Sequence, residues 1–120
     1  MRKAVFCALV AVALVVAGQL LAADAKPVTV KGEVVDTMCY ASMGARGEGH
    51  AKCAIGCAKR GIPVGLVEEG KAAKMYILLP GKDDSPLPEA VTQKMGKVVT
   101  VTGKSYVSGG NSFLTVESVK

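Results

Sequence analysis

One histidine and three cysteines are the residues of this 120-residue chain with the clearest chemical potential. His50 is the only histidine, and with Cys39, Cys53 and Cys57 it forms the pattern C-x10-H-x2-C-x3-C. Thiolates and a neutral imidazole are ligands for Zn²⁺, and thiolate-rich sites also suit Cu(I). The same thiols could instead form a redox pair or a structural disulfide. The sequence therefore offers three chemistries for one short segment.

The segment EGHAKCAIGCAKRG (48–61) is predicted to be helical. It is rich in alanine, Lys59 and Arg60 suit the C-terminus of a helix, and Gly61 suits the position just beyond it. A helix turns by about 100° per residue, so His50, Cys53 and Cys57 would share about 60° of arc. The residues beside this stripe are small and could dock on the rest of the domain: Ala51, Ala54 and Ala58.

Cys39 lies upstream of this helix, after the first predicted strand. The intervening stretch YASMGARGEG (40–49) contains enough glycine to fold back and bring Cys39 over the stripe. The result would be a Cys3His set of metal ligands, namely Cys39, His50, Cys53 and Cys57. Such a set is a standard arrangement for zinc, and its sulfur content also suits copper(I).

Two methionines flank Cys39 and bear on the choice of metal. Met38 and Met43 carry soft thioethers, which would favour copper over zinc. The simpler interpretation is that both side chains pack in the core or against a loop. Two acidic residues, Asp36 and Glu33, also stand near the segment. Either could support His50 as a hydrogen-bond partner, although a surface position at the strand end is the simpler interpretation.

The disulfide and redox alternatives stay open at this stage. A bridge from Cys39 to Cys53 or Cys57 would leave a spare thiol beside His50, because these three cysteines are an odd number. A thiol redox protein would need a reactive thiol, but no C-x-x-C motif is present. Four filled metal positions leave none for substrate, and no acid–base pair or Ser/His/Asp set is evident, so a catalytic function is not indicated.

The N-terminus has the features of a secretory signal peptide. MRK is basic, residues 4–22 are apolar and uncharged, and small residues follow in AADA. Cleavage after Ala25 would leave residues 26–120 as a single domain without Cys7, and without a stable membrane span. We expect the protein in the bacterial periplasm or outside the cell. Export and a modest net charge argue against a nucleic-acid partner, so a metal ion and another exported protein are the expected partners.

Five strands and one helix must position this segment. Alternating, β-branched stretches predict strands, with Gly32 marking a bulge or sharp bend in the first. A helix is predicted at 88–96, between the third and fourth strands, with Pro88 near its first turn and Gly96 beyond its end. The predicted strands are 26–36, 62–69, 73–80, 97–107 and 112–119.

This order matches the five-stranded barrel of the OB-fold. The closing stretch GKVVTVTGKSYVSGGNSFLTVESVK (96–120) resembles the last two strands of such barrels. Over residues 28–120 the chain resembles small exported bacterial OB-fold-like proteins. The resemblance implies a mainly β fold with short helices, in which the Cys/His segment 37–61 is a helical insert between strands one and two.

Overall fold

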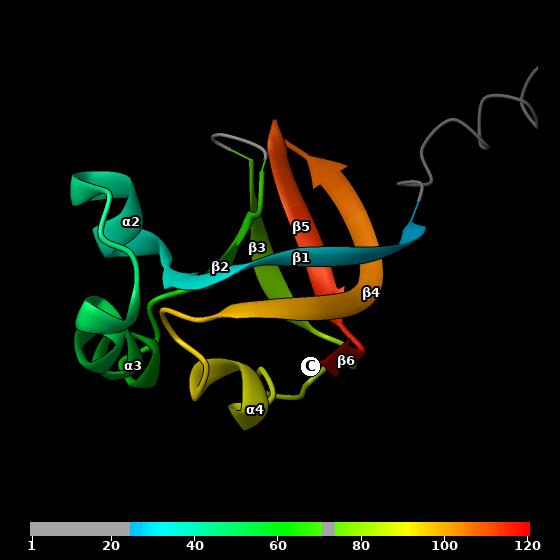
Figure 1. Cartoon of the computed structure of the whole chain (residues 1–120). Coiled ribbons are helices and arrows are strands. Elements are labelled where there is room, and N and C mark those ends of the chain that lie inside the picture. Colours follow the sequence, from blue (N-terminus) through cyan, green and yellow to red (C-terminus); the bar gives the residue numbers. More distant parts are fainter. Residues whose placement is uncertain (1–24, 71–73) are drawn as a thin grey trace, which may run out of the picture.

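The computed structural model describes residues 25–70 and 74–120 (Figure 1). Apart from Ala25, the predicted signal peptide lies outside the described residues. The described part is mainly β, with a few short helices. This agrees with the predicted fold class.

Five strands form a closed barrel. Each strand pairs with its neighbours in the order β1-β2-β3-β5-β4, and β4 pairs with β1 to close the ring. All pairings are antiparallel except that of β3 with β5. This order is compatible with an OB-fold-like barrel. The strands are β1 (Lys26–Asp36), β2 (Val64–Glu68), β3 (Met75–Pro80), β4 (Val98–Ser108) and β5 (Asn111–Val116), and β6 (Ser118–Val119) adds a short pairing to β4.

Strand β1 is long enough to pair with two strands, β4 on one of its edges and β2 on the other. Its first part pairs with β4 and its last part with β2, and Gly32 has a partner in each, Val99 and Glu68. The register passes through Gly32 without interruption, so the predicted bulge is absent from the described strand. A Cβ at Gly32 would meet the carbonyl of Val67, so glycine here permits the close approach of two backbones.

Aliphatic side chains fill the barrel. Val34, Leu66, Val101 and Leu114 are fully buried, and their strands are rich in the apolar, β-branched residues that favour such positions. As the composition suggests, this core contains mostly Val, Leu and Met, with Tyr76 as its buried aromatic residue. Burial of this apolar surface is the main stabilising contribution to the fold.

Helix α4 (Glu89–Thr92) is shorter than the predicted helix at 88–96. The chain leaves the helix after Thr92 because Met95, only 1 % exposed, belongs to the core and forms a bridge with Val34. The amide of Gly96 then donates to the carbonyl oxygen of Val34 at 2.7 Å. Tertiary contacts with β1 therefore end the helix early.

The remaining helices follow β1 and precede β2 in the chain. They are α2 (Thr37–Met43), the 3₁₀ helix η2 (Glu48–His50) and α3 (Ala51–Lys59). Figure 1 shows α2 and α3 together at one end of the barrel, and residues of α3 and α4 line a common pocket beside it. We call residues 37–61 the helical segment.

Candidate metal site

Asp36 ends strand β1 and begins the helical segment. Its backbone is extended, and its Oδ1 accepts a hydrogen bond from the amide of Cys39 at 2.8 Å, so Asp36 is the N-cap of α2. The neighbouring Thr37 amide donates to the carbonyl oxygen of Pro63 at 3.0 Å, which ties the start of α2 to the chain entering β2. Cys39 therefore lies in the first turn of a helix, and this helix takes up the start of the stretch 40–49 that was predicted to be a loop.

Helix α2 ends at Gly44, whose left-handed backbone (φ 66°) reverses the chain direction. The returning loop is held by Glu33 of β1. Its carboxylate accepts from the amide of Gly47 at 2.5 Å and from Arg46 Nε at 3.0 Å. Glu33 is nearly buried, so these charge-assisted bonds fix the loop against the barrel.

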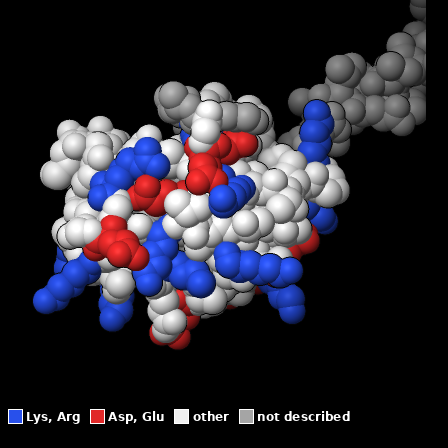
Figure 2. Space-filling view, viewed as in Figure 1, with Lys and Arg blue, Asp and Glu red and all other residues white. Residues whose placement is uncertain are grey.

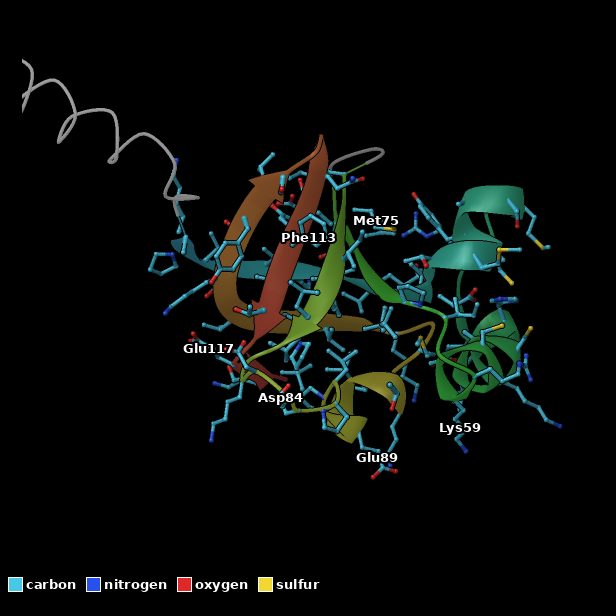
Figure 3. All side chains as sticks on the ribbon, turned by 180° about the vertical axis from the view of Figure 1, so that it is seen from behind. Lys59, Met75, Asp84, Glu89, Phe113 and Glu117 are labelled. Atoms are coloured by element: carbon cyan, nitrogen blue, oxygen red, sulfur yellow. The ribbon has the colours of Figure 1, made fainter. Side chains whose placement is uncertain are left out.

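The helix that was predicted at 48–61 is divided into two parts. Glu48–His50 form the 3₁₀ helix η2, and α3 begins at Ala51. The predicted end is confirmed, because Gly61 adopts φ 91° and the amide of Ile62 donates to the carbonyl oxygen of Cys57. Ala54 is buried against the core, as the predicted docking face requires. Figure 3 shows the Lys59 side chain extending from α3 away from the barrel.

The candidate ligands converge as two overlapping groups. Donor atoms of Cys39, His50 and Cys53 lie within 4.8 Å of one another, and so do those of Asp36, Cys39 and Cys57. Cys39 belongs to both groups, as the fold-back prediction requires. The structure thus contains Cys, His and Asp groups that could hold a metal ion. Figure 3 shows sulfur atoms along the neighbouring parts of α2 and α3.

Asp36 links the two groups. Its side chain is fully buried, and its Oδ2 lies 3.0 Å from Nε2 of His50. Burial alone would raise the pKa of the Asp36 carboxyl, but hydrogen bonds from the Cys39 amide and thiol and from His50 together lower it below its usual value. Asp36 is therefore a carboxylate, and His50 Nε2 is the donor. The surface position favoured for Asp36 and Glu33 from the sequence is wrong.

The three cysteines differ in their surroundings. A hydrogen bond from the Cys39 thiol to Asp36 raises the pKa of that thiol to about 12, with burial and the Asp36 charge adding to the effect. Cys57 is buried, and Arg60 Nη2 lies 3.7 Å from its sulfur. Cys53 is exposed to solvent. All three are free thiols in the structure. Because Cys57 is buried and Cys53 is exposed, the site has one buried side and one open side.

Met38 and Met43 are not packed in the core. Their exposed fractions are 60 % and 71 %, and α2 contains no buried residue. The packing interpretation of these methionines is therefore wrong. In Figure 2 the area over α2 carries no charged side chain, whereas acidic and basic residues alternate over the rest of that face.

The sequence analysis named Asp36 as a possible partner of His50 but favoured a surface position, so it underrated this residue. The sequence did contain a usable signal, because an aspartate directly after a strand and before a short non-strand stretch is a preferred helix N-cap. That signal predicts the bond to the Cys39 amide. It does not predict the bond to His50, which depends on the return of the chain through Gly44 and Gly47.

No helix among residues 25–70 and 74–120 is long and apolar enough to cross a membrane.

Comparison with known proteins gives no significant match. No protein-family model matches the chain, and no curated protein or solved structure matches it significantly.

Proposed function

We propose that this is an exported metal-binding protein that holds a thiophilic ion through Cys39, His50, Cys53 and Cys57. The observation that carries the proposal is that Cys39 lies close to His50 and Cys53 in one group and to Cys57 in the other. Residues from two helices, separate in the sequence, meet beside a buried carboxylate. Export rests on the signal-peptide features of residues 1–25.

Asp36 fits the role of a supporting carboxylate better than that of a ligand. One of its oxygens already accepts from the Cys39 amide and the other from His50. A histidine that binds a metal commonly donates its second ring nitrogen to such a carboxylate. The ligand set is then three sulfurs and one imidazole, which suits Zn²⁺ or Cu(I) and does not suit Mg²⁺ or Ca²⁺.

The open side of the site favours copper(I) handling over a structural zinc. A structural zinc site is closed by four protein ligands. Here Cys53 is exposed, and two exposed thioethers, Met38 and Met43, lie on the helix that carries Cys39. Soft donors that reach solvent would allow a Cu(I) ion to be taken up and passed on.

Elemental analysis combined with thiol counting tests this function. Mature protein purified from its native compartment is expected to contain one copper or zinc ion per chain and three free thiols after unfolding. Cys39→Ser is expected to abolish binding because both groups lose a donor. Ala51→Ser on α3 adds a hydroxyl without removing a donor and is expected to bind normally. Substoichiometric metal together with an oxidised cysteine pair would overturn the proposal.

A thiol redox function is the second candidate. The Cys39 sulfur belongs to a close group with Cys53 and to another with Cys57, so either pairing requires little movement. The high pKa of Cys39 makes it a poor attacking thiol, which leaves Cys53 or Cys57 for that role. Alkylation of the protein in whole cells followed by mass spectrometry separates the candidates. Reversible bridging that is lost in Cys57→Ala would support redox chemistry.

A further inference from the structure

The contact between Asp36 and His50 specifies more than the proximity of two side chains. A carboxylate can only accept a hydrogen bond, so at 3.0 Å the Nε2 atom of His50 must carry the proton. In a neutral imidazole the other nitrogen, Nδ1, then has the free lone pair. His50 is mostly shielded from solvent, with 20 % of its side chain exposed, and Asp36 is fully buried. Water therefore competes weakly with this contact.

We propose that Asp36 is a positioning residue that fixes His50 as the Nε2–H tautomer and leaves Nδ1 as the donor available to a metal. The inference rests on the proposed metal-binding function for its purpose, but the tautomer itself is a property of the metal-free protein. A ring held in this way loses little freedom when an ion binds, and a carboxylate partner also makes the imidazole a stronger ligand.

Because Asp36 caps α2, the orientation of its side chain is fixed, and a substitution at this position can invert the tautomer of His50. In Asp36→Asn the side-chain oxygen must still face the Cys39 amide, because that amide can only donate. The NH2 group of the new side chain would then face Nε2 of His50. An NH2 group donates, so Nε2 must accept and the ring proton must move to Nδ1. The substitution preserves shape and helix capping while it inverts the tautomer.

The experiment is ¹⁵N NMR of His50 in the metal-free, reduced protein, at a pH high enough that the ring signals no longer change with pH and the neutral imidazole is observed. His50 is the only histidine, so its ring signals need no assignment. The wild-type protein is expected to give the pattern of an Nε2–H ring, and Asp36→Asn that of an Nδ1–H ring. A wild-type Nδ1–H ring, or an equal mixture of the two forms, would overturn the proposal.

Two variants separate the tautomer effect from a structural effect. Asp36→Ser can still cap α2 but is too short to reach His50, so the tautomer should become mixed. Glu33→Gln changes the other nearly buried carboxylate of β1, which contacts Arg46 and Gly47, and should leave the Nε2–H ring intact. Loss of the Nε2–H form in Glu33→Gln would mean that the tautomer of His50 depends on the general order of the helical segment and not on Asp36. If Asp36→Asn does not fold, the spectra of the wild-type protein and of Asp36→Ser still show whether Asp36 fixes the tautomer of His50.

Titration with Zn²⁺ and with Cu(I) then tests the function separately. Either ion is expected to shift Nδ1 while Nε2 keeps its proton, and Asp36→Asn is expected to bind about 10–100-fold more weakly. Coordination through Nε2 would overturn the proposal. An Nε2–H ring that neither ion perturbs would confirm the positioning by Asp36 and refute the metal-binding function.

Discussion

The barrel and the helical segment are held by different kinds of contact. The barrel encloses a continuous aliphatic core with several fully buried side chains. In the helical segment, α2 has no buried residue and α3 has only Ala54 and Cys57. Besides the docking of α3 on the core through Ala54, the segment is fixed by two carboxylates of β1, Asp36 and Glu33, and by a close backbone contact with Gly96.

This difference separates stability from binding. Apolar burial stabilises the barrel without any ligand, whereas a segment held by few directed contacts has a low local stability. A metal ion bound between α2 and α3 would add the cross-link that packing does not provide. The barrel is then the scaffold, and the helical segment is the part whose order a ligand can change.

The largest effect is expected in the core of the barrel. Leu114 is fully buried, so Leu114→Ala should lower the free energy of unfolding by about 2–5 kcal/mol through lost burial and an unfilled cavity. Urea unfolding monitored by circular dichroism measures this change. Val107→Ala, at a position with 73 % exposure, is the control and should change stability by less than about 0.5 kcal/mol. Equal effects would contradict the assignment of the core.

Metal loading should act on the helical segment. At a free ion concentration about 100 times Kd, the bound state gains about 2.7 kcal/mol, so amide exchange in residues 37–61 should slow by up to about 100-fold. Hydrogen exchange with mass spectrometry, before and after chelation, measures this. Amides at the exposed β4–β5 turn (Gly109 and Gly110) are the internal control. Protection at the turn alone would place the ion elsewhere.

Two glycine substitutions test the contact between the barrel and the segment. Gly96 and Gly44 both have positive φ, 75° and 66°, but only Gly96 has a close neighbour, the backbone of Gly47 and Glu48. Gly96→Ala should therefore cost about 1–3 kcal/mol more than Gly44→Ala, because its methyl group must displace backbone. Urea unfolding of both variants gives the difference. Equal costs would show that the contact does not hold the segment.

The smallest effect is expected at a surface ion pair of the barrel. Lys31 Nζ lies 2.7 Å from Glu69, but both side chains are more than half exposed, so Lys31→Ala should cost no more than about 1 kcal/mol. Glu33→Gln, which weakens the charge-assisted bonds to Arg46 and Gly47, should cost more, about 1.5–3 kcal/mol. Thermal unfolding of both variants ranks them. The reverse order would mean that the segment is not anchored by Glu33.

Much of the barrel could be predicted from the sequence. The alternation in residues 26–36 and 97–107 predicted β1 and β4 to within a residue or so at each end, because alternation reports directly which face of a strand is buried. Gly61 as the end of α3 followed from local backbone preferences. The length of α4 did not, because Met95 is drawn into the core by β1, which is distant in sequence.

The sequence by itself determined the donor types, their helical spacing and the strands that support them. These features depend on local conformation, which a residue pattern encodes. Only the tertiary structure decided that Asp36 is buried, that it holds both Cys39 and His50, and that Met38 and Met43 face solvent. Burial and hydrogen-bond partners depend on what distant parts of the chain pack against a residue, and neighbouring residues in the sequence do not specify that.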